Sequence, residues 1–291
     1  MVKGWKYYNH ALIPTVQPHE QADLSLLDSK QFWKDWEGVP FFARWTENYD
    51  LGYETEWWYI IKDCPFDVME LKSKRRYKIT KGNQYFEVKE IDPENYKKEL
   101  LAVQIEAFSA YPEKYRPKVN EIDFFEDIDE MARNKKKGRQ KIYGAFFRET
   151  NELCGYHTID IFDKSQGSFV LKTKPQFEKY NLNAAIVYKW VMDASELLKN
   201  GGYLHNGTRN LNHETNFQEY LIDLFHFRKS YCSLKLKFRP GTKPLFILLR
   251  FFKPVLIWLD NIGLIHKVNA VMKMEEISRK KINEGGKTIG P

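Results

Sequence analysis

The sequence has few cysteines, no apolar run at its start and no internal repeat. Its three cysteines, Cys64, Cys154 and Cys232, are far apart and form no C-x-x-C pair. That spacing argues against a zinc ribbon and a disulfide framework, and it favours a reducing cytoplasm. The N-terminal residues lack the apolar core of a signal peptide. We therefore expect a cytoplasmic protein without a metal site.

The rest of the composition is that of an ordinary globular protein. Hydrophobic residues make up 43% and charged residues 29% of the 291 residues, which suffices for one or two domains. The formal net charge is +7 and is spread along the chain. This charge permits an anionic ligand, an anionic lipid surface or nucleic acid as a partner, and it selects none of them.

Hydrophobic periodicity predicts an α/β (α+β) fold. Residues 86–238 read as strand, helix, three strands, helix, strand, helix and strand, with a β-hairpin over 142–161. A central hairpin with a βαβαβ finish implies a mixed, mostly antiparallel sheet with helices on both faces. We expect an aromatic-rich N-terminal region with a basic helix (1–84), a central domain (85–240) and an amphipathic helical extension (241–291).

A basic helix is predicted from Asp67, at its N-cap, to Lys81, with Gly82 as its C-terminal stop. One interpretation is a solvated face. The other is capture of a phosphate-bearing substrate, since two basic faces exceed what solubility requires. The substrate-binding candidates on this helix are Lys74, Arg75, Arg76 and Lys81. A second basic stretch, 133–141, is expected to form an exposed loop.

A very polar loop over 205–216 lies between a short strand and an amphipathic helix. It holds two imidazoles, a guanidinium, a carboxylate and four carboxamides. It can be a network of caps and turns, or it can line a ligand pocket at a strand-to-helix corner. In the second case Arg209 would clamp an anion, and Glu214 or His213 would act as general base toward an amine.

Two segments carry a resemblance to known families. The helix from Asn216 to Arg228 resembles the last helix of GNAT acyltransferases, with His226 where that family has glycine. The segment 71–82 resembles the basic helix of FemAB-like transferases, which are built from GNAT-type domains. The resemblance covers residues 55–240. It implies a GNAT-like fold and an N-acyltransferase. In our hypothesis for such an enzyme, Arg209 and Asn216 would orient an amine acceptor.

The chain departs from the GNAT pattern at 176–184. There the family has a glycine-rich loop that holds the pyrophosphate of coenzyme A, and this chain has no glycine. Asparagine tolerates left-handed backbone geometry, so Asn181 or Asn183 can replace glycine beside Lys179. Two donors therefore remain open. One is acetyl-CoA or another acyl-CoA bound by these three residues, and the other is aminoacyl-tRNA, which FemAB-like enzymes use without that loop.

Aromatic and imidazole side chains supply further candidates. Strand alternation places the rings of Trp57 and Trp58 on opposite sides, one in the core and one free to stack on a sugar or base. We assign Trp57 to the substrate. His157 is expected to be a satisfied core histidine, and Tyr156 is a further candidate for general acid.

The segment 245–259 has 12 apolar residues of 15, interrupted by Arg250, Lys253 and Pro254. It is too short and too charged to span about 30 Å of hydrocarbon. Either it packs on the protein or in a homo-oligomer, or it makes a peripheral contact at the inner face of the membrane.

The sequence thus predicts an N-acyltransferase that transfers an acetyl or aminoacyl group to an amine in surface polysaccharide or cell-envelope biosynthesis. The alternative is a catalytically inactive GNAT-fold scaffold of a glycan-synthesis locus. RNA binding is the third hypothesis, although no RNA-recognition signature appears.

Overall fold

Strand pairing joins segments that lie far apart in the sequence. The computed structural model describes residues 4–113, 116–211, 216–260, 263–282 and 288–289. The chain forms two units from discontinuous segments. The first contains Met1–Tyr59, Thr208–Thr215 and Lys229–Pro291, and the second contains Ile60–Gly207 and Asn216–Arg228. The three consecutive regions expected from the sequence, 1–84, 85–240 and 241–291, stay a prediction.

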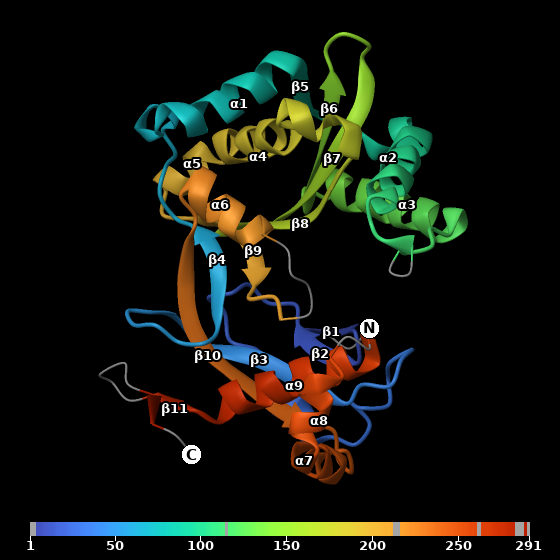
Figure 1. The fold of residues 1–291 in the computed structure, drawn as a ribbon, viewed down its shortest axis with the longest axis vertical. Coiled ribbons are helices and arrows are strands. Elements are labelled where there is room, and N and C mark those ends of the chain that lie inside the picture. The colour runs from blue at the N-terminus through green and yellow to red at the C-terminus, as the bar shows by residue number, and fades with distance from the viewer. Residues whose placement is uncertain (1–3, 114–115, 212–215, 261–262, 283–287, 290–291) are drawn as a thin grey trace. The chain divides into compact units, whose positions relative to one another are not determined.

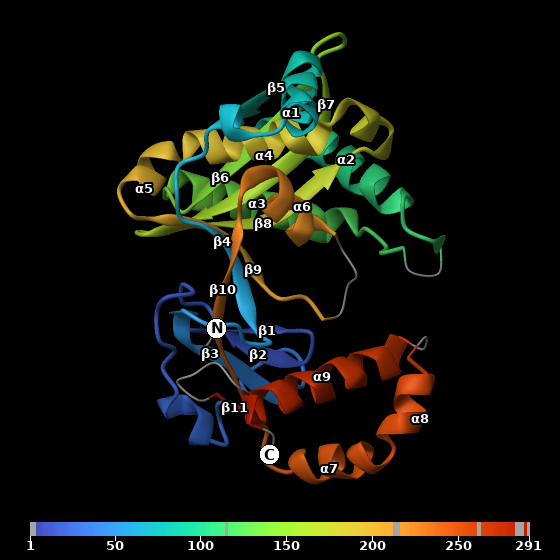
Figure 2. The same cartoon turned by 60° about the vertical axis from the view of Figure 1, so that its left-hand side comes forward.

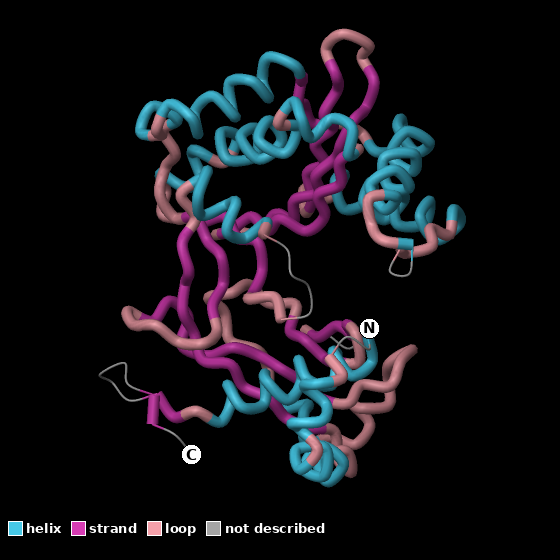
Figure 3. Tube along the Cα trace, in the orientation of Figure 1, coloured by secondary structure: helices cyan, strands magenta, loops and turns pink. Residues whose placement is uncertain are grey.

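The second unit contains a mixed sheet. Its strands lie in the order β4-β9-β8-β7-β6-β5. Neighbours from β5 to β8 are antiparallel, whereas β8 and β9 are parallel. The strands are β4 (Trp58–Lys62), β5 (Phe86–Glu90), β6 (Gln140–Phe147), β7 (Glu152–Ile161), β8 (Ser165–Thr173) and β9 (Tyr203–Thr208). Figure 3 shows the β6–β7 hairpin, so the predicted hairpin is confirmed.

Helices cover both faces of this sheet, as Figures 1 and 2 show. On one face α2 and α3 pack on β6 and β7 through a core that includes Leu100, Ile128 and Tyr156. On the other face α4 contributes Leu182 and Ile186 to a second core. The helices are α1 (Ser73–Tyr85), α2 (Lys97–Ser109), α3 (Glu121–Lys136), α4 (Leu182–Asp193), α5 (Ser195–Lys199) and α6 (Phe217–Phe225), with 3₁₀ turns η2 (Val68–Glu70), η3 (Pro93–Tyr96) and η5 (Pro175–Tyr180). The predicted fold class is confirmed.

The first unit has its own strands and cores. Strands β1, β2, β3 and β10 lie in that order. An aromatic core surrounds Trp5 and Trp33, and a second core joins Trp57 and Cys232 to α9 through Ile277. The elements are β1 (Trp5–Tyr8), β2 (Ala11–Pro14), η1 (Ser25–Asp28), β3 (Phe42–Leu51), β10 (Arg228–Phe238), α7 (Lys243–Phe251), α8 (Lys253–Trp258), α9 (Gly263–Arg279), β11 (Lys281–Ile282) and β12 (Thr288–Ile289).

Two local predictions are corrected by the structure. Gly82 does not end the basic helix, because α1 continues to Tyr85. A Cβ atom on Gly82 would lie 2.7 Å from the carbonyl oxygen of Asn181, so glycine allows α1 to approach the start of α4. The stretch 133–141 is not a loop. Its first four residues form the last turn of α3, where cations favour the negative end of the helix dipole, and β6 begins at Gln140.

Candidate functional site

Strands β8 and β9 separate after a short parallel pairing. Their register contains three pairs, which end at Gly167 with His205, although both strands continue. At the next position a side-chain contact replaces the backbone ladder, because Asn206 Nδ2 donates to Ser168 Oγ at 3.1 Å. The edges of two diverging strands offer backbone groups that a bound ligand can pair with. The strands therefore diverge at residues 167 and 205, at the start of the polar segment 205–216.

The hydroxyl of Ser168 lies between two nitrogens at this divergence. His157 Nε2, from β7, is 2.9 Å from Ser168 Oγ, and Asn206 Nδ2 occupies a second side. His157 Nδ1 is buried and has no hydrogen-bond partner. A buried N–H without an acceptor is rarer and costlier than an unpaired lone pair, so the proton belongs on Nε2. Ser168 Oγ then accepts two hydrogen bonds, and its own O–H is directed away from both donors.

His157 is neutral over the whole physiological range. The side chain is fully buried, its ring meets Trp190 edge-on at 5.2 Å, and burial lowers its pKa to about 3. It therefore serves Ser168 as a fixed hydrogen-bond donor and not as a charged group. The expectation of a core histidine is right about its burial, and the contact with Ser168 adds a polar role that its sequence context did not indicate.

A second imidazole, that of His205, lies directly before Asn206 in β9. Both ring nitrogens of His205 are shielded from solvent without hydrogen-bond partners, although the residue as a whole is half-buried. Burial lowers its pKa to about 4. The ring lies on Gly167, where a Cβ atom would come within 2.8 Å of it. The neutral His205 ring therefore covers Gly167, its partner in the last pair before the strands diverge.

The proposed cofactor residues lie around the start of α4. Asn181 adopts the left-handed conformation at φ 60°, as its expected substitution for glycine requires, and no side chain caps the helix there. Lys179 is exposed beside this turn, with its amine 5.0 Å from the centre of the Tyr180 ring. Asn183 accepts a hydrogen bond from Thr173 Oγ1 on β8. An uncapped helix start with a nearby cation suits an anionic group.

The predicted substrate residues of the basic helix all lie on α1. Lys74 is exposed, and Arg75 Nη2 forms an ion pair at 3.1 Å with Asp223 of α6. Arg76 Nη1 contacts the sulfur of Met69 at 3.6 Å, and Lys81 is half-buried one turn before the end of the helix. The cations are therefore divided between open solvent and contacts within the unit.

Arg209 belongs to the first unit and lies against Glu56 and Trp58 of the same unit, at the start of β4. Its backbone N–H donates to the Trp58 carbonyl at 2.8 Å, and Nη1 donates to the Glu56 carbonyl at 2.7 Å. The guanidinium lies 4.7 Å from the centre of the Trp58 ring, and the Lys229 amine lies 4.6 Å from the same centre. Both contacts are in the range of cation–π interactions.

The assignment of Trp57 is corrected by its burial. Its side chain is 1% exposed and packs in the core with β10 and α9, so its ring is not accessible to a sugar or base. Trp58 is the half-exposed indole of the pair. Asn216 precedes α6 and its carbonyl accepts from Tyr220 N. The two candidate bases, His213 and Glu214, lie outside the described residues.

Sequence patterns missed Ser168 altogether. Its contact with His157 depends on an irregularity in the β7–β8 register, where Phe169 is the extra residue between Ser168 and Val170. Asn206 is expected in the polar loop over 205–216, but the structure places it in strand β9. No local signal connects these three residues, because they come from three strands.

Comparisons with known proteins give structural neighbours only. No family model matches the chain, and no curated protein does. FemX is 11% identical over 69% of this chain and 66% of its own, with a TM-score of 0.47. The C-terminal domain of a putative lysylphosphatidylglycerol synthetase from Agrobacterium fabrum is 10% identical over 84% of this chain and 82% of its own, at 0.48. A GNAT-family acetyltransferase from Staphylococcus aureus Mu50 is 13% identical over 47% and 80%, at 0.37.

These neighbours include both groups of proteins that the sequence resembles. The chain spans 66% of the FemX chain and 62% of a Bacteroides thetaiotaomicron protein of unknown function that it also matches. Because the TM-scores lie below 0.5, we infer the function from the chain's own residues. Within the described part of the chain, no three His, Cys, Asp or Glu side chains are grouped to hold a metal ion. None of the described helices has the length and apolar character needed to cross a bilayer.

Proposed function

We propose that the protein transfers an acyl or aminoacyl group to an amine at the divergence of β8 and β9. The observation that carries the proposal is the Ser168 hydroxyl, whose oxygen accepts from His157 and Asn206 so that its proton is available to a ligand. In acyl transfer the amine nitrogen attacks the donor carbonyl, and the bond from that carbon to the leaving sulfur or oxygen breaks. The leaving atom gains negative charge, which a positioned hydroxyl stabilises.

The proton balance needs one acid and one base. The amine loses a proton to a general base. Glu214 and His213 are the candidates for that base that the sequence gives, as Arg209 and Asn216 are for orienting the acceptor. The leaving thiolate or alkoxide accepts a hydrogen bond from Ser168 Oγ–H and finally takes up one proton, which balances the proton that the general base removes from the amine. His157 cannot supply a charge because its pKa is about 3. Its role is to hold Ser168 in the donating orientation.

Two donors fit the described residues. If the donor is an acyl-CoA, its diphosphate would meet Lys179, Asn181 and Asn183 at the uncapped start of α4. Coenzyme A would supply a thioester whose sulfur is the leaving atom. If the donor is aminoacyl-tRNA, the cations of α1, together with Trp58 in place of Trp57, are the candidates for its phosphates and bases. We also propose that the acceptor comes from surface polysaccharide or envelope synthesis. A lipid-linked acceptor would bring the protein to a membrane, which the exposed apolar side chains of 245–259 would contact.

The test is a transfer assay by mass spectrometry, with acetyl-CoA or charged tRNA as donor and a panel of amines as acceptors. Ser168→Ala should lower kcat by roughly 100-fold with little change in KM, and Ser168→Thr should restore most of the rate. Glu214→Gln should abolish transfer while the fold persists. Ser109→Ala, at an exposed position on α2, is the matched control.

The outcomes separate catalysis from binding. Full activity in Ser168→Ala would remove the hydroxyl from the reaction. Consumption of neither donor by the wild-type protein would leave the scaffold alternative, and calorimetry with acetyl-CoA would then show whether the start of α4 binds the cofactor.

A further inference from the structure

Helices α7 and α8 expose an unusual amount of apolar surface. Phe251 is 79% exposed and Trp258 is 81% exposed. Side chains of this size seldom face water in groups on a monomeric protein, and such patches mark interaction surfaces. The other large apolar side chains exposed on the two helices are Leu245, Ile247, Leu248, Phe252, Val255 and Ile257. We call these eight residues the α7–α8 apolar face.

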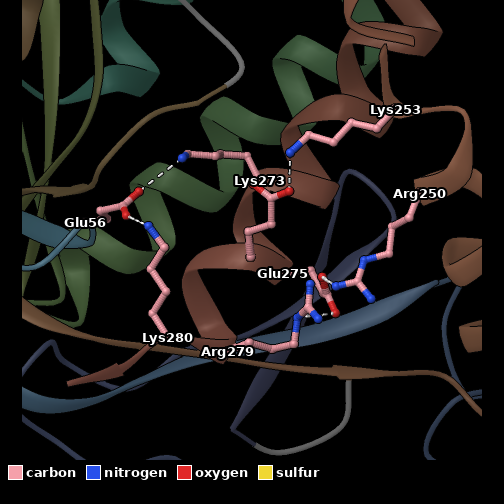
Figure 4. A network of polar contacts seen from close by, with 8 residues as sticks. Glu56, Arg250, Lys253, Lys273, Glu275, Arg279 and Lys280 are labelled. Carbon is pink, nitrogen blue, oxygen red and sulfur yellow. Dashed lines mark hydrogen bonds and ion pairs between the residues drawn. The ribbon is translucent and has the colours of Figure 1, made fainter. Parts of the chain in front are cut away.

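Two of the three charged residues of the same helices, Arg250 and Lys253, are paired with α9. Arg250 Nη2 lies 3.2 Å from Glu275 Oε2 of α9, and the Lys253 amine contacts Glu276 of α9. Figure 4 shows both cations directed at α9, whose C-terminal part is bound in turn to Glu56. Apolar side chains thus dominate the exposed surface of this segment, while two of its three cations are held in ion pairs with α9. Water does not favour so large an exposed apolar surface, whereas an apolar environment does.

A cationic cavity lies beside the α7–α8 apolar face. It has a volume of about 720 Å³ between the end of β10, α7 and α9, with apolar walls that include Phe238 and Phe246. Asp28 pairs with Lys237, and Glu275 pairs with Arg250 and Arg279, so the cations outnumber the carboxylates around the cavity. The charged residues that line it are Lys237, Arg239, Lys243, Arg250 and Arg279, against Glu275 alone.

We infer that the α7–α8 apolar face docks on an anionic lipid bilayer, with the cavity facing the headgroup layer. The apolar side chains would enter the boundary between headgroups and acyl chains, and Trp258 would lie at its level. The cavity cations would meet the lipid phosphates. A second copy of the chain fits less well, because a two-fold contact through this face would bring two positive cavities together.

The experiment is co-sedimentation with vesicles of phosphatidylcholine alone and of phosphatidylcholine with 25% phosphatidylglycerol (about one lipid in four). Wild-type protein should bind the anionic vesicles and bind them more weakly at high salt. Phe251→Ser with Trp258→Ser should weaken binding by roughly tenfold or more. Lys243→Gln should weaken binding to anionic vesicles by roughly fivefold and leave binding to phosphatidylcholine unchanged.

The control is Ile122→Ser, which removes an apolar side chain that is 70% exposed on α3 and should bind as wild type does. Thermal unfolding of each variant checks that the fold is kept. Equal binding of wild type to both vesicle types, or wild-type binding by the double variant, overturns the inference. Dimerisation that the double variant abolishes, without vesicle binding, would assign the face to a second copy and would also overturn it. These outcomes are independent of the transfer assay.

Discussion

Acid should destabilise this protein through the buried imidazole of His157. The folded state holds the ring neutral, with a pKa of about 3, whereas the unfolded chain protonates near 6.5. Because the folded pKa is the lower one, the unfolded state takes up the proton first as the pH falls. The stability is therefore complete above about pH 6.5 and declines toward pH 3.

The magnitude follows from these two values. At pH 5 the unfolded imidazole is about 97% protonated and the folded one about 1%, which corresponds to about 2 kcal/mol relative to pH 7.5. The assay is urea unfolding at both pH values for wild type and His157→Gln. Glutamine has no titrating group, so the variant should lose about 2 kcal/mol less on acidification, whatever its stability at pH 7.5.

The comparison between variants removes the contribution of other titrating groups. His226→Asn is the control, since it deletes an exposed imidazole and keeps a residue that tolerates the left-handed conformation of that position. It should reproduce the wild-type decline. If His157→Gln loses as much stability as wild type between pH 7.5 and 5, the imidazole is not held neutral by burial, and the orientation of Ser168 argued from it fails.

Two further substitutions test the packing. Gly82→Ala should destabilise the protein by about 1–3 kcal/mol in thermal unfolding, because the added Cβ meets backbone atoms at the start of α4 and the gain in helix propensity does not offset that overlap. The control is Gly52→Ala, where nothing lies within 4 Å of the added Cβ. Equal effects of the two substitutions would refute close packing of α1 on α4. Trp57→Ala should cost about 3–5 kcal/mol in urea unfolding, whereas Trp58→Ala should cost about 1–3 kcal/mol from partial burial and its two cation–π contacts. A larger loss of stability in Trp58→Ala than in Trp57→Ala would show that Trp57 is not the buried indole.

Local patterns sufficed for the hairpin and for most helices of the second unit. Alternation over 142–161 and the apolar stripe after Leu182 depend on neighbours a few positions apart, so the sequence contains the whole signal. The left-handed backbone at Asn181 was also predictable, because it is a property of that residue type. Strand β3 was missed, since it pairs with β10, whose residues lie almost 200 positions away.

Sequence alone determined the central hairpin, the helix after Leu182 and the residue types that could carry chemistry. It showed that one of two adjacent indoles must be buried, but only packing against α9 decided that Trp57 is that one. Only the register of three strands brought Ser168 between His157 and Asn206, and only the contacts of α9 turned Arg250 and Lys253 inward. The physical reason is the sequence separation over which each interaction acts. Backbone preference and periodicity act over a few residues, whereas burial and hydrogen bonding depend on which distant segments meet.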